Sequence, residues 1–111
     1  MSKKIQIKYN TNLTVISEVF LEKLKKFRSV HITISCDGYK ESYEYIRIGA
    51  KWGTFLHNFL LLQKISRDIK YNMSLSIHIV SQRDNIMDIP KLLLFLEKFK
   101  NLKIKLTILT N

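Results

Sequence analysis

Four segments of this chain alternate between apolar and polar residues over most of their length, and this alternation constrains its fold more than any other feature. They cover residues 4–10, 30–35, 75–80 and 102–109. Because successive side chains of a β-strand point to opposite faces, each segment predicts a strand with one apolar and one polar face. Parallel sheets with helices on both faces show near-continuous apolar runs instead. The alternation therefore predicts a sheet that helices cover on one face only.

Helical patterns fill the segments between these strands. Gly49 is placed to end a short helical turn, and Asp88 is expected to cap the last helix, which carries Pro90 in its first turn. Strands that alternate with helices call for parallel pairing, and right-handed crossovers between sequential strands put the three longer helices on one face. The predicted helical segments cover residues 14–27, 41–47, 51–68 and 88–99.

The length of 111 residues suits a single domain with one core. We predict an α/β fold in two layers, in which a four-stranded parallel sheet has three main helices on one face. This arrangement is similar to half of a TIM barrel, so the prediction is one half-barrel domain over residues 1–111. The uncovered face carries the residues predicted to bind a partner, which are Lys8, His31, His78, Lys103 and Lys105.

Basic residues are in large excess. Nineteen Lys and Arg against nine Asp and Glu give a formal net charge of +10. A charge of this size favours attraction to an acidic protein surface or to nucleic acid. Solubility or a lysine-rich coding bias is the alternative explanation.

Targeting signals and cysteine usage bear on the compartment. No apolar run is long enough to cross a bilayer, and the N-terminus alternates like a strand instead of forming a secretory signal. The single cysteine rules out an internal disulfide and suits a reducing compartment. We therefore expect a cytoplasmic protein without a membrane partner, located in the host cytoplasm if the source is a virus.

Residues that often carry chemistry show no catalytic or metal-binding pattern. His31, His57 and His78 lack metal-ligand spacing with one another or with carboxylates, so no metal site is predicted. Cys36 continues the apolar phase of its strand and is expected to pack as a small hydrophobic residue. The sequence also lacks a glycine-rich phosphate loop. No catalytic residue is predicted.

Several segments resemble radical S-adenosylmethionine (SAM) enzymes. Residues 30–38, read as Val-His-Ile-Thr-Ile-Ser-Cys-Asp-Gly, and the following residues 43–47 and 49–52 resemble the middle of such an enzyme. Thr-Asn at residues 11–12 looks like the Thr-Asn-Gly that follows the third barrel strand. Residues 75–90 are similar to the fifth strand and next helix of members with SPASM or twitch extensions. The resemblance covers the third to sixth barrel strands.

This resemblance implies roles for three residues. Ser35 and Asp37 match the Ser-x-Asp-Gly element near the ribose of SAM, and Arg47 matches a partner of the SAM carboxylate. Asp37-Gly38 is also an ordinary turn signal, with glycine supplying a positive φ. The family holds a 4Fe-4S cluster with three cysteines in a CxxxCxxC loop, and this chain has only Cys36. The isolated chain is therefore expected to bind neither SAM nor a cluster, unless a partner chain completes the barrel.

Three functions remain open from the sequence. The first is a non-catalytic binding module derived from a radical SAM half-barrel, such as a viral or mobile-element inhibitor of an acidic protein or nucleic-acid-binding complex. The second is one subunit of a split radical SAM enzyme, or a half-barrel completed by a second copy. The third is a nucleic-acid-binding protein. Tyr9 lies in the apolar phase, so the polar face lacks the aromatic pair on which RNA-binding sheets stack bases.

Overall fold

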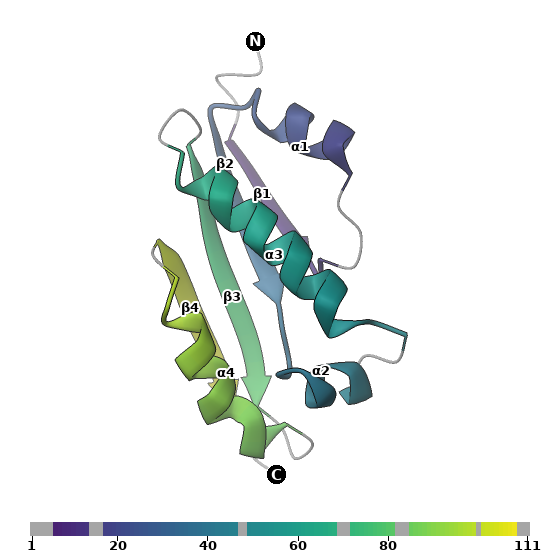
Figure 1. Cartoon of the computed structure of the whole chain (residues 1–111). Coiled ribbons are helices and arrows are strands. Elements are labelled where there is room, and N and C mark those ends of the chain that lie inside the picture. Colours follow the sequence, from purple (N-terminus) through teal and green to yellow (C-terminus); the bar gives the residue numbers. More distant parts are fainter. Residues whose placement is uncertain are drawn as a thin grey trace.

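The computed structural model describes residues 6–13, 17–46, 49–68, 72–81, 85–99 and 101–108, without the side chains of Gln6, Ile7 and Glu18. Strands and helices alternate along these residues, as the sequence predicts (Figure 1). In chain order they are β1 (Gln6–Thr11), α1 (Glu18–Leu24), β2 (Ser29–Ser35), α2 (Glu41–Ile46), α3 (Trp52–Ser66), β3 (Met73–Ser81), the 3-10 turn η2 (Ile86–Asp88), α4 (Ile89–Leu96) and β4 (Leu102–Ile108).

The sheet is entirely parallel, with its strands in the order β1-β2-β3-β4. Figure 1 views this sheet through α1, α3 and α4, which all lie in front of it. Helices on one side are what right-handed crossovers between sequential parallel strands produce. The predicted α/β class, with a four-stranded parallel sheet and its main helices on one face, is confirmed. Its likeness to half of a TIM barrel stays a prediction.

The core lies between the sheet and the helices. Burial alternates residue by residue along β2 and β3, so that one face of each strand is buried and the other is open. Ile32 and Ile77, at the centre of these strands, are fully buried. Phe59 and Leu62 of α3 belong to the same core. The predicted period-two pattern therefore sets which face the helices cover.

Aromatic rings join α2, α3 and α4 at one end of the core. The ring of Trp52 lies 5.5 Å from that of Tyr43, 5.3 Å from that of Phe55 and 5.9 Å from that of Phe95. Aromatic pairs at these separations add about 0.5–1.5 kcal/mol beyond the area that they bury. These rings thus pack as core, and they fix the short α2 against the longer helices.

The helix α1 is shorter at its C-terminus than the sequence pattern predicts. Ser17 occupies the N-cap position, and its hydroxyl accepts a hydrogen bond from the Phe20 amide at 3.1 Å. The helix ends at Leu24 because the chain turns toward β2, with the Phe27 amide bonding the Leu24 carbonyl at 3.3 Å in a tighter turn. The predicted first residues of this helix, 14–16, lie outside the described residues.

The start of α4 differs from the predicted cap. Asp88 occupies the N-cap position, yet its side chain makes no capping hydrogen bond. The turn η2 runs directly into α4, so Asp88 already has near-helical backbone angles (φ −96°, ψ −7°) instead of the extended ones that a capping side chain needs. Its carboxylate lies 3.8 Å from the ammonium of Lys91 instead. Pro90 lies in the first turn, as predicted.

The apolar side of β4 is only partly covered, contrary to the sequence prediction. Its apolar side chains become more exposed along the strand, at 37% for Ile104, 39% for Leu106 and 62% for Ile108. This strand lies at the edge of the sheet and pairs only with β3. Leu102 alone of the described β4 residues packs against the core. A row of apolar side chains is therefore left open beside α4.

Candidate functional site

The five residues predicted to bind a partner share the face of the sheet opposite the helices. In the strand register Lys8 lies beside His31, and His78 lies beside Lys105. Lys103 lies two residues before Lys105 on the same face, because side chains on one face recur every second residue. On β2 and β3 no residue in this phase is buried, whereas the opposite phase is buried throughout. We call the surface that these five residues define the open face.

Hydrogen bonds between neighbouring strands hold the two histidines of the open face. Nδ1 of His31 lies 2.6 Å from the hydroxyl of Ser74, and Nε2 lies 2.8 Å from the hydroxyl of Ser76. A neutral imidazole carries one N–H, so it donates to one of these hydroxyls and accepts from the other. Nε2 of His78 similarly lies 2.9 Å from the hydroxyl of Thr107. Each histidine therefore links two strands and holds its ring in place on the surface.

The charge on the open face has one sign. The strands contain three lysines, Lys8, Lys103 and Lys105, and no aspartate or glutamate. All nine acidic residues of the chain lie outside the four strands. All three lysines are exposed. Three cations without a carboxylate in the same strands create a positive potential that attracts anionic groups.

Asp37 and Asn85 join the carboxyl ends of β2 and β3. Asn85 is only 1% exposed, and its side-chain amide donates to the backbone carbonyls of Asp37 at 2.6 Å and Val80 at 2.8 Å. The Asp37 carboxylate accepts a hydrogen bond from the Val80 amide at 3.3 Å. Sequence reasoning missed this link because Asn85 and Asp37 are separated by 48 residues. Both side chains hold the strand ends together.

The residues that the resemblance assigns to SAM are only partly described. Ser35 ends β2 on the open face, and Asp37 follows it at the same edge of the sheet. Arg47 lies outside the described residues. Because the carboxylate of Asp37 already bonds the Val80 amide, part of its acceptor capacity serves the fold.

Gly38 has a different role from the predicted one. The only described glycine with a positive φ is Gly49, at +90°, so the prediction of a positive φ at Gly38 is wrong. A Cβ on Gly38 would lie 2.5 Å from the backbone nitrogen of Tyr43. The first turn of α2 thus packs directly against the Gly38 backbone, and any side chain would force the two apart.

The remaining reactive side chains form no site within the described part of the chain. Cys36 is fully buried, as predicted, and its thiol donates a hydrogen bond to the Gly38 carbonyl at 3.3 Å. In that part of the chain no three residues among His, Cys, Asp and Glu come together as metal ligands. None of the described helices is both long enough and apolar enough to cross a bilayer.

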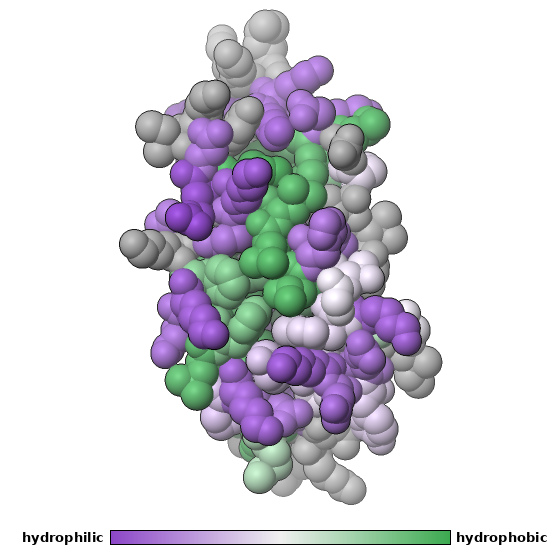
Figure 2. Space-filling view, in the orientation of Figure 1, coloured by the Kyte–Doolittle hydropathy of each residue, from purple (hydrophilic) through white to green (hydrophobic). Residues whose placement is uncertain are grey.

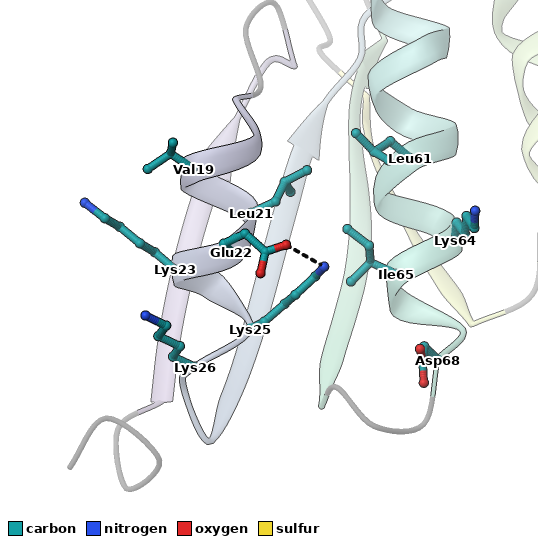
Figure 3. Close-up of a pocket in the computed structure, with 10 residues that line it drawn as sticks. All are labelled: Val19, Leu21, Glu22, Lys23, Lys25, Lys26, Leu61, Lys64, Ile65 and Asp68. Carbon is teal, nitrogen blue, oxygen red and sulfur yellow. Dashed lines mark hydrogen bonds and ion pairs between the residues drawn. The ribbon is translucent and has the colours of Figure 1, made fainter.

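A groove between α1 and α3 is a second surface feature, which the sequence analysis did not predict (Figure 3). It has a volume of about 790 Å³ and lies on the helix side of the sheet. Periodicity shows which residues of a helix are apolar, but it does not show how closely two helices approach. The groove arises because α1 and α3 stand apart along part of their length.

Comparisons with protein-family models, curated proteins and solved structures found no match. The resemblance to radical SAM enzymes therefore stays a prediction.

Proposed function

We propose that this chain is a non-catalytic interaction module whose open face binds an acidic protein surface. One observation carries this proposal: β2 and β3 bury one face completely, while no described helix lies on the opposite face (Figure 1), and the only charged side chains of the described strands are basic. A sheet face without its own helix layer is available to a partner, and complementary charge steers and orients such an encounter.

The composition of the open face favours a protein over single-stranded nucleic acid. Proteins that bind single strands stack bases mainly on aromatic side chains, and the polar phase of these strands contains no Phe, Tyr or Trp. Its two histidine rings are held by hydrogen bonds to the neighbouring strands. Tyr9 lies on the helix side, where its ring is 5.0 Å from that of Phe20. Imidazole, hydroxyl and ammonium groups remain, and these suit carboxylates on a protein surface.

On the basis of the resemblance to radical SAM enzymes, we extend this proposal to the evolutionary origin of the module. In this view the chain is a half-barrel remnant, of the kind that a virus or mobile element could use to inhibit a nucleic-acid-binding complex. The support is the four-stranded parallel sheet together with the segments that resemble the family.

A second candidate function is that of one subunit in a split radical SAM enzyme. The free edge of β4, with its exposed apolar residues, favours it, because a neighbouring strand from another chain would cover both. Co-purification with a cysteine-rich, iron-containing chain would support this candidate. A stable monomer that binds no such chain would exclude it.

Charge reversal on the open face tests the first proposal. Lys103→Glu/Lys105→Glu is compared with Lys51→Glu/Lys98→Glu, which makes the same charge change at exposed positions outside the strands. Each variant is used as bait to capture proteins from native lysate that has been treated with nuclease. A captured protein is then purified, and its binding to each variant is measured by titration. We expect the open-face pair to weaken binding about tenfold or more at low salt, and the control pair to have little effect.

Two results would contradict the proposal. One is equal binding by both double variants, which would place the contact elsewhere. The other is loss of all binding on nuclease treatment, which would identify nucleic acid as the partner.

A further inference from the structure

The groove between α1 and α3 has an apolar floor. Leu21 of α1 and Leu61 and Ile65 of α3 point toward one another across it (Figure 3). Val19, at its margin, is 65% exposed. Figure 2 shows a hydrophobic stripe running down this helix-bearing face, bordered by hydrophilic side chains. Leu21 and Ile65 are nearly buried, at 5% and 9% exposed, and form the base of the groove. Val19 and the half-buried Leu61 supply its more exposed apolar surface.

Lysines border this floor on both sides. Lys23 and Lys26 extend from the outer side of α1, and Lys64 extends from the far side of α3 (Figure 3). Lys25 reaches over the groove and pairs with Glu22 at 3.2 Å. The four lysines outnumber the two carboxylates of the lining, Glu22 and Asp68. An apolar floor between basic margins is complementary to a ligand with an apolar stripe and acidic flanks.

The dimensions of the groove fit a short helix. Its lining covers residues 19–26 beside α1 and 61–68 beside α3, which is about 12 Å or two helical turns on each side. Small amphiphiles bind well only when a pocket encloses most of their surface, and among the residues that line this groove only Lys25 reaches across it (Figure 3). A helix needs only one face covered, so it is the better match.

We propose that this groove binds an amphipathic helix of a partner protein, with apolar residues at i, i+4 and i+7 and acidic residues on both flanks. The apolar stripe lies over Val19 and Leu61, above the buried Leu21 and Ile65, and the acidic flanks extend across the two helices to Lys23 and Lys64 at their outer margins (Figure 3). This site lies on the helix side of the sheet, away from the open face. It therefore stands or falls independently of the function proposed above.

The test uses a defined probe and two charge-reversal pairs. The probe is a fluorescein-labelled helical peptide with leucine at i, i+4 and i+7 and glutamate on both flanks. Binding is followed by fluorescence anisotropy with wild type, with Lys23→Glu/Lys64→Glu and with the open-face pair Lys103→Glu/Lys105→Glu. We expect the groove pair to bind about tenfold more weakly and the open-face pair to bind like wild type. Thermal unfolding of each variant controls for the fold.

Backbone amide shifts in NMR locate the contact. On addition of the peptide, the proposal predicts changes concentrated at residues 19–26 and 61–68. A control peptide with lysine in place of glutamate should not bind. The proposal is overturned if the peptide fails to bind, if the groove pair binds it as well as wild type, or if only a fatty acid such as laurate occupies the groove. Loss of peptide binding in the open-face pair alone would also overturn it.

Discussion

Single residues decide how closely the elements of this fold approach one another. Gly49 was predicted from a local signal, and the structure gives it a positive φ of +90°. The two residues before it, 47–48, lie outside the described residues, so its role as a helix stop stays a prediction. Gly38 could not be understood in the same way. Glycine is required at position 38 because the backbone of Tyr43, in the next helix, lies too close for any side chain. Asn85 is similar, since its partner Asp37 is distant in sequence. Local patterns do not reveal tertiary contacts of this kind.

Replacing Gly38 tests this close approach. Gly38→Ala places a Cβ 2.5 Å from the Tyr43 nitrogen, so β2 and α2 must separate. We expect the free energy of unfolding to fall by about 1–3 kcal/mol, the range for a forced backbone shift. Gly53→Ala is the matched control, because its Cβ meets nothing within 4 Å and alanine is the better helix former. Urea unfolding of both variants measures the difference, and a Gly38→Ala variant as stable as wild type would refute the contact.

At the scale of elements, the central strands follow the sequence pattern more closely than the edge strand. Alternation predicts the two faces of β2 and β3 because both strands have neighbours on each side and helices above. The same alternation in β4 does not predict burial, because this strand lies at the edge of the sheet, where its apolar side chains stay exposed. The groove between α1 and α3 was missed for a related reason, because helix separation depends on packing.

The lysines of β4 are expected to keep this edge strand from pairing with other copies. Charged side chains, lysine above all, are a common protection of exposed strand edges. Lys103→Thr/Lys105→Thr removes both charges but keeps residues that suit a strand. We expect this variant to self-associate at concentrations where wild type does not, as measured by sedimentation velocity.

A further change separates this effect from unfolding. Adding Ile104→Thr and Leu106→Thr removes exposed apolar surface and should restore the monomer. If the lysine variant remains as monomeric as wild type while folded, the edge needs no such protection.

At the scale of the whole molecule, the chain presents two basic surfaces on opposite sides of one layered fold. The open face is polar, and the groove is apolar with lysine margins. The sequence predicted the first surface because strand parity assigns residues to faces: Lys8, His31, His78, Lys103 and Lys105 all lie on the predicted side. What binds there depends on the partner's chemistry, which no pattern in this chain encodes.

Thiol accessibility tests most directly whether the polar side of the sheet is uncovered. Ser74→Cys and Ser76→Cys each place one thiol on the open face of β3, and the fully buried Cys36 serves as an internal control. The number of thiols that react with a thiol reagent is measured in the folded protein and again after unfolding. Our account predicts that in each variant one thiol reacts in the native protein and the second only after unfolding, whereas wild type shows no native reaction. Protection of both introduced thiols in the folded protein would mean that the face is covered, and it would contradict the account.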